Sequence, residues 1–367
     1  MLDQNRRVRD QNVSSTPKLP SPRGIWSTCS LSAAAEENIL DSRDQIWNIL
    51  TGLDQRLLVI VGPCSIHNSE SALRYAKHII RWNDRFGDKF CMVMRAYFAK
   101  PRTKLGWSGL VYDPFLNGNG DLSVGLLEVW KLSVELATLG VPAATEALDS
   151  ITTQYFSHAM SWVAIGARAA EASPLRYLAS AESPVVGIKN PTSGWALPAI
   201  EGIVAIRHPH IFPGINADGQ AASIESNGNR RVHLVLRGGR SEDPGKPSRK
   251  NYRRRDLARV DEYLAQEGVD DTGYVIDCSH ANAGGNYLNQ IMVAKNVVEQ
   301  RREGNRRIAG IMIESNHMPG KQSIPTDLTG FNASALDPDT SVTDACLGLD
   351  DTESLLAHLY RRHKLTA

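Results

Sequence analysis

Short apolar runs of the kind that form buried strands recur along the chain, and helical stretches separate them. Eight such runs lie at residues 56–62, 90–97, 141–148, 162–168, 185–190, 232–239, 273–280 and 310–315. The intervening stretches, such as 71–86 and 287–304, carry apolar residues at helical spacing. Repeated strand–helix units favour a parallel sheet with helices packed outside it. This alternation places the chain in the α/β class.

A ninth apolar run, at 210–216, fits a different structure. Asp218-Gly219 and a second short run follow it, a pattern typical of an antiparallel hairpin with a tight turn. Taken as a hairpin inserted at about 210–226, this segment leaves eight strand–helix units. Eight units close a (β/α)8 TIM barrel, which is the predicted fold. An open doubly wound sheet is the alternative.

The N-terminal part of the chain differs from the rest in composition. Residues 1–30 are polar and contain Pro17, Pro20 and Pro22, so they are interpreted as an arm outside the core. Residues 32–53 are predicted to be helical. The expected division is therefore an arm and helix at 1–53, followed by a catalytic barrel at 54–367 that includes the hairpin.

Charge and cysteine content exclude several classes of protein. The 41 Lys and Arg residues nearly balance the 40 Asp and Glu residues, so no overall field would attract nucleic acid or anionic lipid. No apolar run approaches the length that spans a bilayer. The five cysteines are scattered and form no CxxC pair, which argues against a zinc ribbon and a disulfide framework. We expect a cytoplasmic protein with no nucleic-acid or membrane partner.

Each of the eight predicted strands ends at a chemically competent side chain. In chain order these are Cys64, Arg95, Glu146, Arg168, Lys189, Arg237, His280 and Glu314. Charged residues commonly follow strands because loops are solvated, so no single one of them is informative. Barrel active sites, however, lie at the carboxyl ends of the strands. The complete set therefore predicts one shared cavity.

The predicted cavity residues fall into two chemical groups. Arg95, Arg168, Lys189 and Arg237, with Lys100 and Arg102 nearby, suit a substrate with several anionic groups, such as a phosphate-bearing carboxylate. Cys64, His280 and Glu314, with Asp344 from a later segment, form a mixed donor set suited to a divalent transition metal. The alternative for this second group is a buried thiol beside an ordinary hydrogen-bonding histidine.

At these residues the sequence resembles the class I 3-deoxy-D-arabino-heptulosonate 7-phosphate (DAHP) synthases, of the feedback-regulated microbial type. The matching segments are GPCSIHN (62–68), MRAYFAKPRTKLGWSGL (94–110), TEALD (145–149), SWVAIGAR (161–168), GIKN (187–190), LRGG (236–239), DCSHAN (277–282), IMIES (311–315) and SVTDACLG (341–348). They extend over nearly the whole of the predicted barrel.

The resemblance implies a TIM barrel that condenses phosphoenolpyruvate with erythrose 4-phosphate, in the presence of water, to DAHP and phosphate. It implies one divalent metal ion (Mn, Fe, Co or Zn) held by Cys64, His280, Glu314 and Asp344. The phosphoenolpyruvate contacts would be Arg95, Lys100, Glu146, Ala167, Arg168, Lys189 and Arg237. The sugar-phosphate contacts would be Lys100, Pro101, Arg102 and Thr103. Lys100 is the candidate proton donor, with Glu146 and His280 as the other catalytic candidates.

The resemblance also has implications for assembly and regulation. It implies a homodimer or homotetramer whose N-terminal arm crosses to a neighbour, and an aromatic amino-acid effector. The segments TEALD, NADGQ and IAGIMIES look closest to the tryptophan-sensitive branch. Pro213-Gly214 and the segment 151–156 alter what would line the effector pocket.

Three segments depart from the family pattern. Pro191-Thr192-Ser193-Gly194 stands where members usually carry Gly-Thr-Asp-Gly, and the loops at 240–272 and 315–340 look longer than usual. Within the first of them, the basic run 249–259 is predicted to lead into a helix. Proline removes a backbone donor and favours an extended residue before it, which affects the region beside Lys189. Two further interpretations therefore stay open. One is a paralogue that condenses phosphoenolpyruvate with a different aldose phosphate or an amino analogue. The other is a non-catalytic relative that acts as a regulatory subunit.

Overall fold

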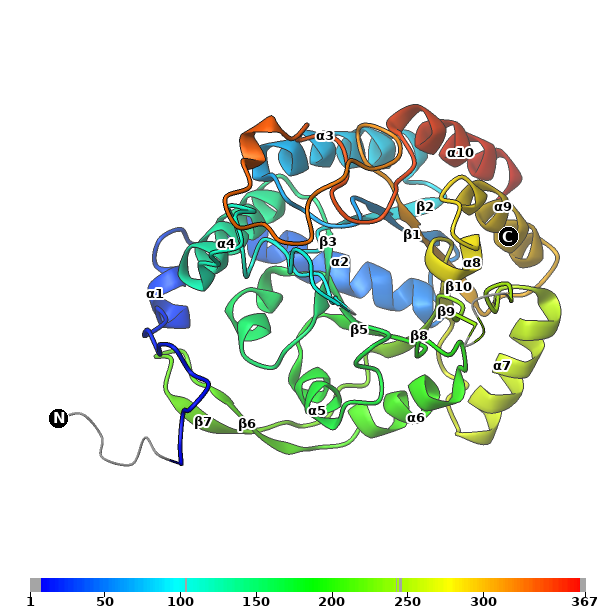
Figure 1. Ribbon diagram of the computed structural model, residues 1–367. Coiled ribbons are helices and arrows are strands. Elements are labelled where there is room, and N and C mark those ends of the chain that lie inside the picture. The colour runs from blue at the N-terminus through cyan, green and yellow to red at the C-terminus, as the bar shows by residue number, and fades with distance from the viewer. Residues whose placement is uncertain (1–7, 103, 242, 244–245, 364–367) are drawn as a thin grey trace.

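The computed structural model describes residues 8–102, 104–241, 243 and 246–363, and its core is a closed barrel of eight parallel strands (Figure 1). The barrel order is β1-β10-β9-β8-β5-β4-β3-β2. Closure is direct, because β1 pairs in parallel with β10 from Leu58 opposite Gly310 onward. The predicted TIM barrel is confirmed, and the open doubly wound sheet is wrong. The strands are β1 (Leu57–Gly62), β2 (Phe90–Arg95), β3 (Ala143–Ala147), β4 (Trp162–Ile165), β5 (Val185–Lys189), β8 (Val232–Leu236), β9 (Tyr274–Asp277) and β10 (Ile308–Glu314).

An outer layer of helices covers the barrel (Figure 1). Asn68 caps α3 by accepting a hydrogen bond from the Ser71 amide, and Asp121 caps α4 in the same way at Val124. After β3 the chain forms only two 3₁₀ turns, η1 (Thr152–Tyr155) and η2 (Ser157–Ala159). The outer helices are α3 (Ser69–Phe86), α4 (Leu122–Thr138), α5 (Ser173–Ala181), α6 (Leu197–Ile206), α7 (Arg254–Gln266), α9 (Asn289–Arg302) and α10 (Leu349–Arg362).

The inside of the barrel is filled with side chains and closed at its amino end by a helix. α2 (Ala33–Leu50) lies across this end, and its Ile46, Ile49 and Leu50 join the interior cluster (Figure 1). Trp162 fills the middle and donates from its indole nitrogen to His233 Nε2 at 2.8 Å. A Cβ at Gly187 would lie 2.1 Å from the Trp162 ring, so only glycine leaves room for it.

The inserted hairpin is confirmed as an antiparallel pair, β6 (Ile211–Ile215) and β7 (Ala221–Glu225). Gly219 adopts a φ of 76° in its turn, a conformation that favours glycine. The N-terminal segment packs against this turn, since the Arg23 amide donates to the Ala217 carbonyl at 2.8 Å.

Two sequence-based expectations need correction. The arm predicted for residues 1–30 contains a short helix, α1 (Pro22–Trp26), which Ser21 caps. Its Ile25 is buried in the core, so this part of the segment is not outside it. The loop predicted at 240–272 is too long, because the helix expected after the basic run is α7 (Arg254–Gln266), whose Leu257, Val260 and Leu264 supply a buried helical face. The segment 315–340 contains only the 3₁₀ turn η3 (Ala333–Ala335).

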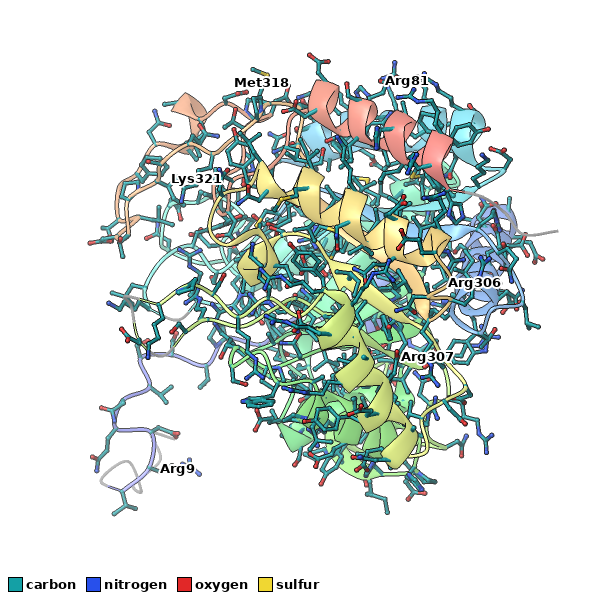
Figure 2. The ribbon with its side chains drawn as sticks, turned by 90° about the vertical axis from the view of Figure 1, so that its right-hand side faces the viewer. Arg9, Arg81, Arg306, Arg307, Met318 and Lys321 are labelled. Carbon is teal, nitrogen blue, oxygen red and sulfur yellow. The ribbon has the colours of Figure 1, made fainter. Side chains whose placement is uncertain are left out.

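A view from the side separates the two ends of the barrel. In Figure 2, α7, α9 and α10 face the viewer, Lys321 lies at the carboxyl end of the strands, and Arg306 and Arg307 lie toward the opposite end. Among the described residues, no helix is long and apolar enough to cross a membrane.

The closing helix α2 gives a direct test of how the barrel is stabilised. Replacing fully buried Ile46 with alanine should lower the free energy of unfolding by about 2–5 kcal/mol, because it opens a cavity under the strands. Leu40→Ala on the same helix is the control, since Leu40 is 52% exposed. Urea unfolding of both variants measures the difference. Equal losses would contradict the role of α2 as the floor of the interior core.

Candidate active site

A cavity of about 380 Å³ lies at the carboxyl ends of the strands. Among the described residues that line it, eight are cationic and only Glu146 and Asp344 are acidic. Such an excess of positive charge favours a substrate with several anionic groups. The lining residues are Arg95, Tyr97, Lys100, Pro101, Arg102, Lys104, Leu105, Glu146, Ala167, Arg168, Lys189, Arg237, Arg240, His280 and Asp344.

Arg95, the last residue of β2, is fully buried and paired with a carboxylate from the neighbouring side of the barrel. Its Nη2 lies 3.1 Å from Glu314 Oε1 at the end of β10. Burial alone would lower the pKa of Arg95, but Tyr97 and Glu314 raise it above its ordinary value. The guanidinium group therefore stays charged at the base of the cavity.

Lys189 and Glu146 form a second buried ion pair across the cavity floor. Lys189 Nζ at the end of β5 lies 2.6 Å from Glu146 Oε2 on β3. Burial raises the pKa of Glu146, but Lys189 outweighs this effect and the pKa lies below its ordinary value. Burial lowers the pKa of Lys189, but Glu146 and Tyr97 bring it above its ordinary value. A Cβ at Gly166 would lie 2.5 Å from Glu146 Oε1, so this glycine leaves space for the carboxylate.

A cluster of metal-ligating atoms lies beside these ion pairs. Cys64, Glu314 and Asp344 each offer one donor atom, and the three atoms lie within 4.8 Å of one another. His280 adjoins this group, with its Nε2 3.7 Å from Glu314 Oε1. A thiol, an imidazole and two carboxylates suit a divalent transition metal, so the donor set fits such an ion.

The Lys100 ammonium group lies inside the same cluster. Its Nζ donates to Cys64 Sγ at 2.7 Å and to Asp344 Oδ2 at 3.0 Å. Burial would lower the pKa of Lys100, but Cys64 and Asp344 raise it above its usual range. Lys100 in turn lowers the pKa of Asp344. The Cys64 thiol and the Asp344 carboxylate therefore both contact a positively charged ammonium group.

His280 is held in an unusual backbone conformation. Its φ is 51°, which is uncommon for a residue with a side chain and costs on the order of 1–3 kcal/mol. Its Nδ1 lies 2.8 Å from Asp277 Oδ2, and Asp277 is fully buried with a pKa lowered by His280. Burial by itself would raise that pKa. A carboxylate on the far ring nitrogen is the arrangement that orients metal-binding histidines.

The other predicted contacts lie at the same cavity, with one exception. Ala167, Arg168, Arg237, Pro101 and Arg102 all line it. Arg237 is largely buried, and among the described residues its Nη1 has no hydrogen-bond partner. Thr103 lies outside the described residues.

Sequence reasoning missed several residues of this region. Tyr97, Lys104 and Arg240 line the cavity, and Asp277 lies behind His280. Lys104 lies within a matched segment, Arg240 directly follows one and Asp277 begins one, so their positions carried a signal. Tyr97 carried none beyond its place in a matched segment, because a tyrosine in an apolar stretch is usually a packing residue.

Hydrogen bonds from Asn190 hold the segment around Pro191 against the cavity wall. The side-chain Nδ2 of Asn190 donates to the Pro191 carbonyl at 2.8 Å and to the Gly238 carbonyl at 3.0 Å. Its side-chain oxygen accepts a hydrogen bond from the Arg237 amide at 2.8 Å. The proline therefore leaves Lys189 paired with Glu146 and fixes the backbone that carries Arg237.

Two further cavities adjoin the barrel. One, of about 550 Å³, shares Arg237, Arg240, His280 and Asp344 with the first and extends toward Lys321. The other, of about 300 Å³, lies under the hairpin, away from the strand ends. Trp26, Phe212 and Ile224 give it apolar walls, and Glu182 and Ser183 add polar groups.

Comparison with known proteins gives a consistent result over almost the whole chain. The model of the DAHP synthetase I family matches residues 31–357. The chain is 40% identical over 357 residues to the Tyr-sensitive phospho-2-dehydro-3-deoxyheptonate aldolase of Salmonella typhimurium, covering 97% of this chain and 95% of the relative. It is 37% identical over 350 residues to the Phe-sensitive aldolase of Escherichia coli, covering 95% and 96%. The solved phospho-2-dehydro-3-deoxyheptonate aldolase from Francisella tularensis superposes with a TM-score of 0.88 at 33% identity, covering 96% of this chain and 98% of that one.

The Glu146–Lys189 pair gives a test of the buried charges. Glu146→Gln should lower the free energy of unfolding at neutral pH by about 3–5 kcal/mol, because it leaves Lys189 buried without a counter-charge. The double variant Glu146→Gln/Lys189→Met should recover much of that loss. Chemical denaturation at neutral pH measures all three proteins, and a double variant as unstable as the single one would contradict the pairing.

The same pair predicts a pH dependence. Because the pKa of Glu146 is lowered, its contribution to stability is complete above the ordinary carboxyl pKa and is lost as the pH falls through the lowered value. The raised pKa of Lys189 keeps its contribution until the pH rises above the ordinary lysine value. Stability from the pair should therefore be constant near neutrality, and acidification should destabilise the double variant less than the wild type.

Proposed function

The chain belongs to the DAHP synthetase I family, and we infer from this that its barrel-mouth cavity is the active site of a phospho-2-dehydro-3-deoxyheptonate aldolase. The enzyme condenses phosphoenolpyruvate with erythrose 4-phosphate and releases DAHP and phosphate. The observation that carries the assignment is the meeting of a cationic cavity with a cluster of metal donors at the strand ends. Both substrates are polyanions, so their association needs preorganised positive charge.

We propose that phosphoenolpyruvate binds at the base of the cavity. Arg95 and Lys189 are the deepest cations, and Arg168 and Arg237 lie on the same lining. Arginine pairs bidentately with carboxylate and phosphate, so these groups can hold both ends of the molecule. The Ala167 segment completes this wall. The unpartnered Nη1 of Arg237 would gain an acceptor when the anion binds.

Erythrose 4-phosphate is proposed to bind nearer to the mouth. Pro101 and Arg102 lie there, and Arg102 is exposed, as a phosphate clamp at the cavity entrance requires. Thr103 belongs to the same proposed clamp and lies outside the described residues. Lys100 lies between this group and the deeper cations, so it can contact both substrates.

One divalent metal ion (Mn, Fe, Co or Zn) is proposed to bind Cys64, His280, Glu314 and Asp344. When bound, it supplies Lewis-acid polarisation of an aldehyde oxygen. Asp277 orients the His280 ring, and Lys100 is the group that can donate a proton to the oxygen of the aldehyde.

The residues around the reacting atoms suit a condensation at carbon 3 of phosphoenolpyruvate. That carbon attacks the aldehyde carbon, the aldehyde oxygen takes a proton from Lys100, and carbon 2 becomes electrophilic. A water held near Glu146 adds to carbon 2 and gives one proton to Glu146, with Lys189 beside it to stabilise the charges. The bond from carbon 2 to the phosphate oxygen then breaks, and the new hydroxyl on carbon 2 loses its proton to the departing phosphate, which leaves the ketone of DAHP.

A second candidate concerns the aldehyde substrate. The cavity of about 550 Å³ shares His280 and Asp344 with the active site and extends toward Lys321. A paralogue that uses a different aldose phosphate or an amino analogue is the alternative to erythrose 4-phosphate, and its substrate would extend into this second cavity.

The metal and the substrate are tested together by phosphoenolpyruvate consumption. Protein stripped with a chelator and then supplied with Mn, Fe, Co or Zn should regain turnover with erythrose 4-phosphate, and Cys64→Ala should lose it together with bound metal. Cys29→Ala is the matched control, since Cys29 lies on the outer side of the barrel. Turnover only with other short aldose phosphates would favour the second candidate. Turnover in the metal-free protein would contradict the metal site.

Regulation is proposed to act through the cavity under the hairpin. Relatives are named Tyr-sensitive and Phe-sensitive, and the sequence segments favour the tryptophan-sensitive branch, so all three amino acids are candidate effectors. The apolar walls suit an aromatic ring, and the Glu182 carboxylate suits an ammonium group. Burial raises the pKa of Glu182 to about 7, against smaller lowering effects from Ser157 and Arg43.

Effector binding should therefore depend on pH. Inhibition by the active amino acid should strengthen as the pH rises through about 7, because Glu182 then becomes charged. Arg43 stays cationic beside it, and the pKa of His158 is lowered by burial, so neither contributes a change in this range. Inhibition constants across this range, for wild type and Glu182→Gln, measure the effect.

The cavity-filling variant Ile224→Trp provides the second arm of this test, because it should remove inhibition and leave turnover unchanged. Unchanged activity under saturating Trp, Phe and Tyr would contradict aromatic feedback. Inhibition that survives in Ile224→Trp would place the effector elsewhere.

We further propose a cytoplasmic enzyme that assembles as a homodimer or homotetramer, with the N-terminal arm reaching a neighbour.

A further inference from the structure

One aromatic ring contacts two of the deepest cations of the active site. The Arg95 Cζ lies 4.0 Å from the centroid of the Tyr97 ring, and the Lys189 Nζ lies 4.9 Å from the same centroid. Tyr97 follows β2 by two residues and is 2% exposed at the base of the cavity. No other described aromatic ring lies over two cations at this distance.

The two cations repel each other at this position. Arg95 acts to lower the pKa of Lys189, which is the effect of a nearby like charge. Their carboxylate partners lie on different strands, with Glu314 on β10 and Glu146 on β3. Each ion pair by itself therefore draws its cation toward a separate side of the barrel.

The hydroxyl group of Tyr97 does not explain why a tyrosine stands here. Among the described residues, it donates to Met312 Sδ at 3.9 Å, and a thioether is a weak acceptor. The same sulfur accepts a hydrogen bond from Arg95 Nη1 at 2.8 Å. The face of the ring carries the negative part of its quadrupole and attracts cations, most strongly where water is excluded.

We propose that Tyr97 is a positioning residue whose ring attracts both the Arg95 guanidinium and the Lys189 ammonium, and so holds these two cations in place to receive one anionic end of phosphoenolpyruvate. This rests on the proposed function, because it takes those two cations as phosphoenolpyruvate contacts. A tyrosine ring restrains both cations without neutralising either of them, which a third carboxylate would do. The net charge available to the substrate is thereby kept.

The test compares Tyr97→Phe with Tyr97→Leu in metal-loaded protein. The phenylalanine keeps the ring face, so its KM for phosphoenolpyruvate should stay within about threefold of wild type. The leucine has no such face, and its KM for phosphoenolpyruvate should rise about tenfold or more. The KM for erythrose 4-phosphate should change little in either variant. Calorimetric titration with phosphoenolpyruvate alone should reproduce the same order of affinities.

Loss of a buried ring also affects packing, and Tyr274→Leu is the matched control. Tyr274 is equally buried, but it begins β9 at the opposite end of the barrel. Its replacement should lower the melting temperature and leave the KM for phosphoenolpyruvate unchanged.

Four outcomes would overturn the proposal. A Tyr97→Leu enzyme with wild-type affinity would show that the ring has no such role. A Tyr97→Phe enzyme as weak as Tyr97→Leu would transfer the role to the hydroxyl group. A rise in both KM values that follows the fall in melting temperature, with Tyr274→Leu behaving alike, would indicate packing only. A wild type that binds no phosphoenolpyruvate would instead refute the proposed function on which this proposal rests.

Discussion

At the mouth of the barrel, several positively charged side chains are buried away from water. The fold is stable only if the free-energy cost of burying these charges is offset. Three of these cations have an acidic partner that comes from a different strand or loop: Glu314 for Arg95, Glu146 for Lys189, and Asp344 for Lys100. An isolated buried charge is strongly destabilising, whereas a paired one is close to neutral. The pairing therefore requires that strands far apart in sequence be held in register, and only a closed barrel does this for β3, β5, β2 and β10 together.

These pairs also explain how the cavity remains attractive to anions. The carboxylates lie beside and below the cations, and the lining keeps a large excess of positive groups. An incoming phosphate meets donors that are already oriented, so little reorganisation is needed when it binds. Tyr97 adds an attraction that leaves this excess unchanged.

The sequence predicted the barrel and the types of residues at its mouth, because a strand that ends at Arg95 or Lys189 has to present that side chain at the carboxyl edge. It could not predict which residues pair, since the Glu314–Arg95 contact joins positions 219 residues apart. Ile25 was assigned to an arm because a lone apolar residue among prolines has no periodicity, and the elements that bury it, α4 and η1 among those that α1 contacts, are distant in sequence. The extent of α7 could not be predicted, because its buried face has only three apolar residues among many charges. The contact of Asp277 with the His280 ring depends on the left-handed backbone conformation of His280, which no local sequence pattern predicts.

The helix across the amino end of the barrel has a consequence for access to the site. Ile46, Ile49 and Leu50 of α2 pack with Trp162 in the interior cluster, so the amino end of the barrel is filled with side chains. A ligand can therefore reach Arg95 and Lys189 only from the carboxyl ends of the strands, where Arg102 is exposed. Every molecule that enters or leaves the deep part of the cavity has to pass this cationic rim.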